Sequence, residues 1–362
     1  MFTRLPAAKP FLASPVASDG RPGYRECFES ALILDNSIDW EHDTMPAHTP
    51  LDRRQFLQQT LAAGAAASLA WSPSTAVAAR SPASDYQVGI YTRPWDQHDY
   101  RVALDAIAEA GFTQAGLMTT TMPWGRLVIS ADTTVEQATA VGEEAQQRGL
   151  QIPSVYGGGI PVQTSLQAGI DGMKRLIDNC EAAGAKDLMM GGIGREDLYE
   201  PYYKAIAATC DYAAERQVSI SVKPHGGTNA TGPDCRKCIE FVGHDNFSLW
   251  YDPGNIFFYS HGELDPVDDA ATVDGLVRVG MCIKDFDMVD RDGTPTRIVA
   301  LTPGTGRVDF AKVLQRLRQG GFTKGHLVIE CLSPGDGSLA SLLAEAKKAR
   351  AFVEQLVADL PA

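Results

Sequence analysis

The sequence predicts a (β/α)8 barrel, the TIM-barrel architecture, formed by a single domain over residues 79–362. From Tyr86 onward, short runs rich in β-branched and aromatic residues alternate with amphipathic helical runs, which is typical of βαβ units and a parallel sheet. Most of the helical runs end in Gly, as helices that stop at a left-handed residue do. Eight such β/α pairs in about 280 residues match the usual size of this barrel.

All eight strands and six of the helices are assigned to ranges of the sequence. The predicted strands are Gln87–Tyr91, Thr113–Met118, Gln151–Tyr156, Asp187–Gly191, Val218–Val222, Ser248–Asp252, Met281–Asp285 and His326–Cys331. The predicted helices are Tyr100–Ala110, Val135–Arg148, Ile170–Ala183, Tyr203–Arg216, Phe310–Arg318 and Ser338–Leu360. An open doubly wound sheet is the alternative, but no Gly-x-Gly-x-x-Gly follows the first strand, which argues against a dinucleotide-binding fold.

The composition excludes some classes of function. A hydrophobic fraction of 44% is enough for a sizeable core, and the net charge of −13 argues against nucleic acid as a partner, which requires a basic face. Cys235-Arg-Lys-Cys238 has the spacing of a metal or redox motif, but no second pair lies at zinc-finger distance. We therefore interpret these cysteines as small buried hydrophobic residues.

Residues 1–78 are predicted to be a leader that precedes the fold. Asp52-Arg53-Arg54-Gln55-Phe56-Leu57 is followed by an Ala-rich apolar run and by Ala76-Val77-Ala78, a small-residue cleavage site. A charged start, an apolar middle and such a site are typical of a secretory signal. The paired arginines resemble the twin-arginine export class. We expect a periplasmic or secreted protein that has no membrane attachment once the signal is removed.

Ionisable residues close the last four predicted strands. The four strand ends read Val222-Lys223-Pro224-His225, Tyr251-Asp252-Pro253-Gly254-Asn255, Cys282-Ile283-Lys284-Asp285 and Ile329-Glu330. Ordinary structural roles are open to each: a turn cap for Asp252, an ion pair with a lysine for Glu330, a loop hydrogen bond for His225, and contacts between loops for Lys284 and Asp285. Because the carboxyl ends of barrel strands carry the chemistry in this architecture, their coincidence predicts a functional site.

These strand ends resemble those of the sugar isomerase/epimerase superfamily, the xylose-isomerase-like barrels. The family pattern is matched by Asp252-Pro253-Gly254-Asn255, Cys282-Ile283-Lys284-Asp285, Ile329-Glu330 and, most specifically, by Pro303-Gly304-Thr305-Gly306-Arg307-Val308-Asp309-Phe310. The resemblance spans the whole domain in layout and 218–331 in motif. It implies a small-molecule carbohydrate as the binding partner.

The resemblance also implies a divalent metal ion (Mn, Mg, Co or Zn), but two of the four usual ligand positions differ. Asp252 and Glu330 are in place, whereas Lys223 occupies the position of a carboxylate and Cys282 that of a histidine. A protonated lysine has no lone pair to give to a metal. His225 lies two residues further on, on the same side of an extended strand, and is the candidate third ligand beside Asp252 and Glu330. Asn255 replaces the family's substrate-contacting histidine.

Two catalytic mechanisms follow, and the sequence leaves both open. With a metal bound, the ion polarises a carbonyl or hydroxyl of the sugar, and Glu330, or Lys223 with a lowered pKa, removes the neighbouring proton. Without a metal, Lys223 and Lys284 stabilise the enolate as fixed positive charges. Isomerisation, epimerisation and elimination of the inosose-dehydratase type share this proton abstraction. A non-catalytic sugar-binding barrel is the remaining alternative.

Aromatic residues in the first half of the domain are candidates for stacking on a sugar. They are Tyr91, Trp95, Trp124 and Tyr156. We expect Trp95 and Trp124, together with Asn255 and Asp285, to bind the substrate. The alternative is that these aromatic rings only cover the hydrophobic core.

Overall fold

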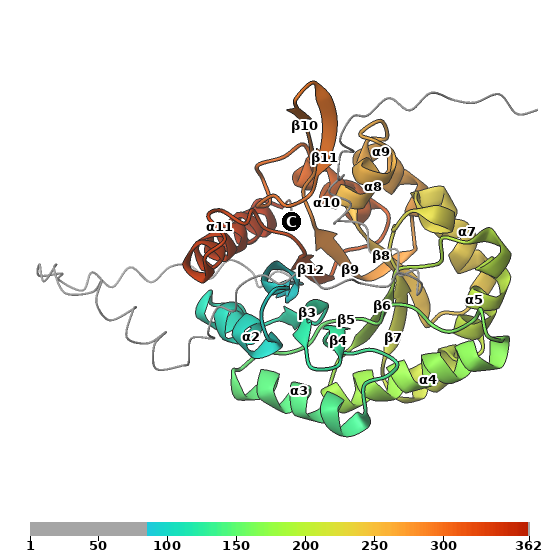
Figure 1. Cartoon of the computed structure of the whole chain (residues 1–362). Helices are drawn as coiled ribbons and strands as arrows, with labels where there is room; N and C mark the ends of the chain where they lie inside the picture. The colour runs from blue at the N-terminus through green and yellow to red at the C-terminus, as the bar shows by residue number, and fades with distance from the viewer. Residues whose placement is uncertain (1–84, 361–362) are drawn as a thin grey trace, which may run out of the picture. The chain divides into compact units, whose positions relative to one another are not determined.

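The computed structural model describes residues 85–360 and confirms the (β/α)8 barrel (Figure 1). Eight strands pair in the order β2-β1-β12-β9-β8-β7-β6-β5, and every pair is parallel. They are β1 (Tyr86–Tyr91), β2 (Ala115–Gly116), β5 (Val155–Tyr156), β6 (Asp187–Met190), β7 (Ser219–Val222), β8 (Phe247–Tyr251), β9 (Val277–Ile283) and β12 (Gly325–Ile329). All eight predicted strands overlap an observed one.

Backbone contacts between the residues around β2 and β5 close the sheet into a barrel. Leu117 pairs in parallel with Val155, and the Tyr156 N–H donates to the Leu117 carbonyl at 2.8 Å. No strand edge is therefore left open between the second and third strands of the barrel.

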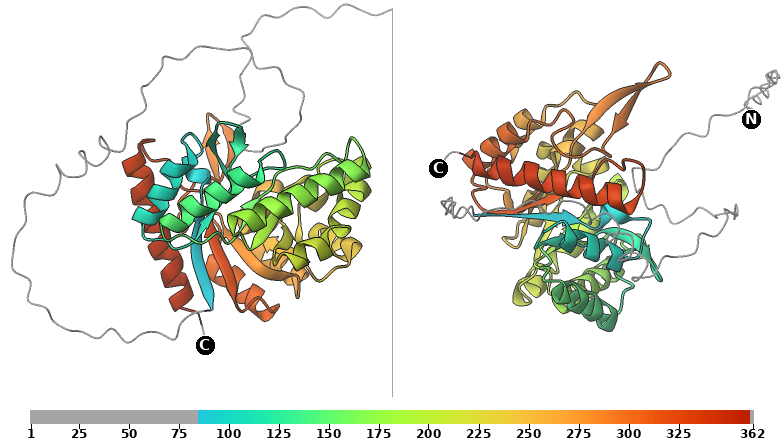
Figure 2. Two further views of the ribbon diagram at one scale, coloured as in Figure 1. Left: turned by 90° about the horizontal axis from the view of Figure 1, so that it is seen from below. Right: turned by 90° about the vertical axis from the view of Figure 1, so that its left-hand side faces the viewer.

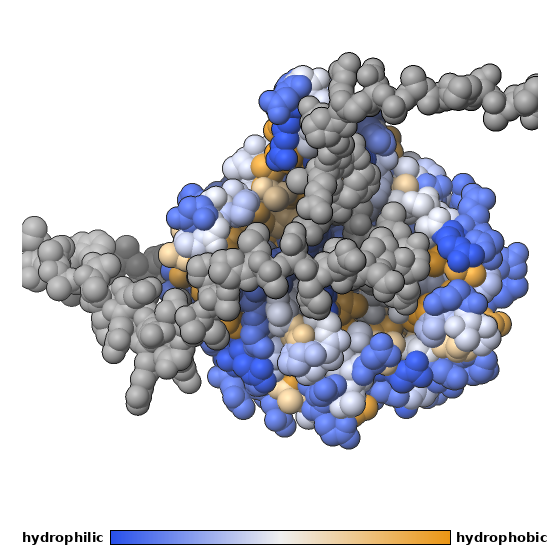
Figure 3. Space-filling model, viewed as in Figure 1, coloured by the Kyte–Doolittle hydropathy of each residue, from blue (hydrophilic) through white to orange (hydrophobic). Residues whose placement is uncertain are grey.

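Helices surround the barrel on its outer side (Figure 1). They are α2 (Tyr100–Glu109), α3 (Val135–Gln147), α4 (Leu166–Ala183), α5 (Tyr199–Ala207), α6 (Cys210–Glu215), α7 (Gly232–Val242), α8 (Pro253–Tyr259), α9 (Pro266–Ala270), α10 (Phe310–Gln319) and α11 (Leu339–Ala358). Their starts follow from local chemistry, because Thr134 and Ser165 cap the backbone N–H groups of α3 and α4. The outward faces of these two helices are largely hydrophilic (Figure 3).

Three features of the helical layer differ from the sequence prediction. The range Tyr203–Arg216 forms two helices, α5 and α6, with Thr209 between them. The sequence analysis did not assign α7, which carries both cysteines of the Cys235-Arg-Lys-Cys238 stretch in buried positions. The third difference is α8, which begins directly after β8 where a turn capped by Asp252 was one alternative, and Asp252 caps this helix by accepting the Asn255 N–H.

Two hairpins extend the loops at the carboxyl ends of barrel strands. One joins β3 (Thr119–Met122) and β4 (Gly125–Leu127), and the other joins β10 (Asp287–Arg291) and β11 (Thr294–Ile298). The second hairpin projects from the barrel (Figure 2). Its turn at Asp292-Gly293 has positive φ angles at both residues, as a tight hairpin turn requires.

The interior of the barrel is filled by its own cluster of side chains, separate from the core between strands and helices. The cluster contains Tyr91, Met118, Met189, Trp250, Cys282 and Val328. Gly280 leaves room for it, since a Cβ there would lie 2.5 Å from the Trp250 ring. These side chains fill the interior beneath the carboxyl-terminal mouth, the face at which barrels of this architecture bind their substrates.

The predicted leader, residues 1–78, lies outside the described residues. Within 85–360, no helix is both long enough and apolar enough to cross a membrane.

Candidate active site

The two-residue period of each strand brings the ionisable side chains into the mouth of the barrel. Trp250 and Val328 point into the barrel, so Asp252 and Glu330, two residues further along, continue on the same inward side. Cys282 also points inward, and Lys284 follows it by two residues. The elements that carry these residues are neighbours in the sheet, so the side chains converge.

Glu330 is the centre of a buried network of ion pairs. Its Oε2 accepts a hydrogen bond from Lys223 Nζ at 2.6 Å, and its Oε1 accepts one from Lys284 Nζ at 3.0 Å. Arg93 Nη1 also donates to Oε1. Lys223 Nζ makes a second contact, at 3.3 Å, with Asp252 Oδ2. Both carboxylates are fully buried and the Lys223 side chain is 2% exposed, so water screens these charges little.

The charges in this network determine which groups hold protons. Burial acts against the charge on Lys223, but attraction by Glu330 and other neighbours outweighs it and holds the lysine pKa well above its usual value. Burial likewise acts to raise the pKa of Glu330, yet Lys223, Lys284 and Arg93 hold it well below the usual range. For Asp252 burial prevails over the two lysines, so its pKa is raised. At neutral pH Lys223 is therefore a fixed cation.

Lys284 and Asn255 form the second layer of the site. Lys284 Nζ donates to Asn255 Oδ1 at 2.8 Å, and Asn255 Nδ2 donates to the Pro224 carbonyl at 2.6 Å. Asn255 is 2% exposed, and both ends of its amide are already used. The sequence predicts that Asn255 binds substrate; in the structure its contacts position Lys284.

Asp285 organises a loop rather than the mouth of the barrel. Its carboxylate is fully buried and accepts four backbone N–H groups, from Phe286, Gly304, Gly306 and Val308, at 2.8–3.1 Å. These bonds fill the acceptor positions of both oxygens. They explain why Asp285 accompanies the Pro-Gly-x-Gly-x-Val-Asp-Phe segment, and they leave no oxygen for the predicted contact with substrate.

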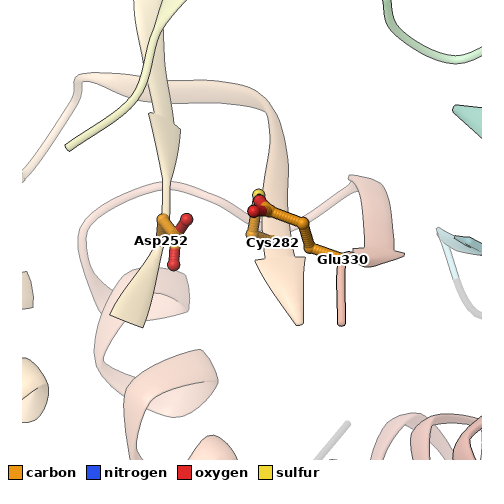
Figure 4. A group of neighbouring side chains, drawn as sticks. All are labelled: Asp252, Cys282 and Glu330. Carbon is orange, nitrogen blue, oxygen red and sulfur yellow. The ribbon is translucent and has the colours of Figure 1, made fainter. Parts of the chain in front are cut away.

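Three side chains of the types that bind metals come together, but a protonated lysine lies among them. Ligand atoms of Asp252, Cys282 and Glu330 lie within 4.8 Å of one another (Figure 4). These are the residues that could hold a metal by chemical type. However, Lys223 Nζ already contacts both carboxylates, and Cys282 Sγ lies 3.2 Å from Glu330 Oε2 with its pKa raised by burial. The group does not fit a divalent metal while Lys223 is protonated, because two cations would share the same oxygens.

His225 does not take the place that the sequence suggested for it. Among the described residues, the group of metal-ligand types contains Cys282 and not His225. The His225 ring is half-buried between Tyr156 and Tyr259, with ring centroids 6.1 and 5.9 Å away. Burial, and then the positive charges of Lys223 and Lys284, lower its pKa to about 3. It is therefore a neutral imidazole in the mouth at neutral pH.

The aromatic residues predicted to stack on a sugar have different surroundings. Trp95 is fully buried in the main core, so it has no exposed ring face for a ligand. Trp124 is half-buried in the turn between β3 and β4. Tyr156 is half-buried in the mouth, with Lys223 Nζ 5.8 Å from the centre of its ring. Tyr259, which was not among the predicted residues, also has its ring against His225, with centroids 5.9 Å apart.

Arg93 is the functional candidate that the sequence analysis missed most clearly. It follows Tyr91, an interior residue of β1, by two positions, and its guanidinium pairs with Glu330. The rule that selected the last four strand ends would have found Arg93 if it had been applied to the first strand.

Comparison with known proteins agrees with this architecture. The family model described as the xylose isomerase-like TIM barrel matches residues 104–356. No curated protein sequence matches the chain.

Several solved structures have the same fold at low sequence identity. A xylose isomerase domain protein from Planctomyces limnophilus is 19% identical, with a TM-score of 0.55, and the match covers 70% of this chain and 91% of that one. D-psicose 3-epimerase from Clostridium cellulolyticum H10, solved with D-tagatose, is 14% identical, with a TM-score of 0.57 and coverage of 75% and 99%.

A xylose isomerase-like TIM barrel protein from Mycobacterium smegmatis, solved in complex with magnesium, is 15% identical, with a TM-score of 0.56 and coverage of 74% and 99%. Identities this low establish the shared fold and not a shared reaction. The family model, in contrast, covers most of the chain. On the strength of that match, the chain belongs to the xylose isomerase-like TIM barrel family.

Proposed function

We propose that the protein is an enzyme of the sugar isomerase/epimerase type that removes a proton next to a carbonyl of a sugar or keto-sugar without a metal ion. The observation that carries the proposal is the position of Lys223 Nζ, hydrogen-bonded to both Glu330 and Asp252. It supplies a positive charge at the point where the family resemblance implies a metal site. Fixed charges in a water-poor site stabilise developing negative charge effectively.

In the proposed reaction, Asp252 accepts the proton from carbon and the electron pair moves to the carbonyl oxygen. The raised pKa of Asp252 suits a base, whereas Glu330, held by three cations, serves to anchor them. The ammonium groups of Lys223 and Lys284 stabilise the enolate oxygen. Delivery of a proton to the opposite face of the same carbon, by a donor other than Asp252 or by water, gives an epimer. Return of the proton from Asp252 to the neighbouring carbon, while the hydroxyl proton moves from one oxygen to the other, gives an isomer. Loss of a hydroxyl group instead would give the elimination product.

The test is exchange of carbon-bound substrate protons with deuterium, measured for a panel of ketoses and keto-sugars in heavy water. Lys223→Met removes the charge at similar length, and we expect it to lower the exchange rate by about 100-fold or more. Asp252→Asn retains the cap of α8 but cannot accept the proton, and should also abolish exchange. Lys312→Met, at an exposed position of α10, is the matched control and should exchange normally. Undiminished exchange in Lys223→Met would disprove the role of its charge.

A non-catalytic sugar-binding barrel is the second candidate, and the saturation of Glu330 by three cations favours it. A carboxylate held in this way is a weak base. Binding of a sugar without any exchange of its protons in the wild-type protein would support this candidate over the enzyme.

A further inference from the structure

We propose that the ligand of the barrel mouth carries a carboxylate, so that the protein acts on an acidic carbohydrate, such as a uronate or a keto-aldonate, rather than on a neutral sugar. The proposal names the substrate class of the proposed function. The statement that this acid reacts rests on the proposed function, whereas the statement that it binds does not. It is derived from the balance of charges in the mouth and from the position of Arg93.

The network in the mouth holds more positive than negative charge. Three cations (Lys223, Lys284 and Arg93) face two carboxylates (Asp252 and Glu330). Protonation of Asp252 would only increase the positive excess. Burying an uncompensated charge is costly, so a site of this kind is completed by an anion.

Other ionisable groups near the mouth do not supply the missing negative charge. The thiols of Cys282 and Cys331 have pKa values raised by burial and stay neutral. The carboxylate of Asp285 is turned to the loop at 304–308, where four backbone N–H groups satisfy it. Asp187 lies at the first residue of β6, the opposite end of the barrel from the mouth.

Arg93 is the cation best placed to meet a ligand. Its side chain is 24% exposed, compared with 2% for Lys223 and 5% for Lys284. One of its N–H groups pairs with Glu330, and within residues 85–360 its remaining N–H groups have no hydrogen-bond partner. A guanidinium with free N–H groups side by side matches the two oxygens of a carboxylate.

The size of the excess argues for a carboxylate over a phosphate. One excess positive charge is balanced by one carboxylate, whereas a phosphate monoester carries about −1.5 to −2 at neutral pH and would leave the buried site negative. A neutral sugar would leave the positive charge unbalanced.

The experiment measures dissociation constants by calorimetry at neutral pH for matched pairs of sugars. D-glucose is compared with D-glucuronate, and L-sorbose with 5-keto-D-gluconate, while D-glucose 6-phosphate is the phosphate probe. We expect at least one acid to bind about tenfold or more tightly than its neutral partner, a difference of about 1.4 kcal/mol. Arg93→Gln should remove this preference, so that the acid and its neutral partner bind with similar dissociation constants.

Arg278→Gln is the matched control, because it removes an arginine near the amino-terminal end of β9, far from the mouth, and should keep the preference. If Arg93→Gln does not fold, Arg93→Lys keeps the charge without the planar fork and should weaken the preference. The comparison in the wild-type protein needs no variant at all.

The proposal is overturned if neither acid binds more tightly than its neutral partner, or if the phosphate binds more tightly than both acids. Its failure is distinguishable from that of the proposed function. Proton exchange on neutral ketoses alone would support the proposed enzyme and contradict the acidic substrate. Tight binding of an acid without proton exchange would support the acidic ligand and contradict the proposed enzyme.

Discussion

Lys223 illustrates how the neighbours of a buried side chain set its charge. The sequence left two roles open for it, a base with a lowered pKa or a fixed cation. The contacts with Glu330 and Asp252 decide for the cation, because the attraction of the carboxylates outweighs the effect of burial. The same contacts place an ammonium group against the carboxylate oxygens of Asp252 and Glu330, which a divalent metal would need as ligands.

Replacing the lysine by a carboxylate should therefore create metal binding. We expect Lys223→Glu to bind Mn²⁺, since three carboxylates would then face the same point without an ammonium between them. At about 100 times the dissociation constant the ion would stabilise the variant by about 2.7 kcal/mol. The measurement is the Tm with and without Mn²⁺, together with bound metal determined by elemental analysis.

The wild-type protein and the surface variant Lys312→Glu serve as controls, and neither should show a Tm increase with Mn²⁺. Stoichiometric Mn²⁺ in the wild-type protein would contradict our interpretation of the site. If Lys223→Glu binds no metal, the variant Lys223→Glu with Cys282→His, which supplies the family's histidine as well, is the next to measure.

At the level of the elements, β6 and β7 bury a carboxylate inside the barrel at the end opposite the mouth. Asp187 accepts hydrogen bonds from Ser219 and Ser221 at 2.8 and 2.7 Å and has no cationic partner among the described residues. Burial raises its pKa to about 7. In the unfolded chain this carboxyl has a pKa of about 3.9 and loses its proton at lower pH than in the folded protein.

The free energy of unfolding should accordingly fall as the pH rises from about 4 to about 7. The loss is at most about 1.4 kcal/mol for each unit by which the pKa of Asp187 differs between the folded and unfolded states. Asp187→Asn removes this titration, and the serine hydroxyls can donate to or accept from the amide. We expect the variant to match the wild type near pH 4 and to be more stable near pH 8, by urea unfolding. Asp245→Asn, at an exposed carboxylate, should show no such pattern. Equal stability of Asp187→Asn and wild type near pH 8 would mean that the buried charge has no cost.

At the level of the whole molecule, the chain has the barrel layout of the xylose isomerase-like family, with eight parallel strands in one sheet. Strand order, closure and the solid interior follow from regular alternation along the sequence, which is why all eight strands could be predicted. Two features could not be predicted: the division of Tyr203–Arg216 into two helices, and the presence of the two hairpins. The loops that connect barrel elements carry little periodic signal.

The signal predicted in residues 1–78 lies outside the described residues and is tested in cells. Changing Arg53 and Arg54 together to Lys should leave full-length precursor in the cytoplasm, because the paired arginines are the feature that resembles the twin-arginine class. Cell fractionation followed by immunoblotting is the measurement. Arg80→Lys, beyond the expected cleavage site, should be exported normally. Export of the double variant at the wild-type level would contradict the assignment.

The sequence by itself determined the architecture and the face at which the site lies. Strand direction and the two-residue alternation are local properties, so the ends of four strands placed Lys223, Asp252, Lys284 and Glu330 at one rim. The tertiary structure decided which of these groups pair. Glu330 pairs with three cations, and Cys282 rather than His225 lies beside the carboxylates. Both outcomes depend on the distances between side chains of different strands and on the burial of those side chains. Neither quantity is encoded in the local sequence pattern.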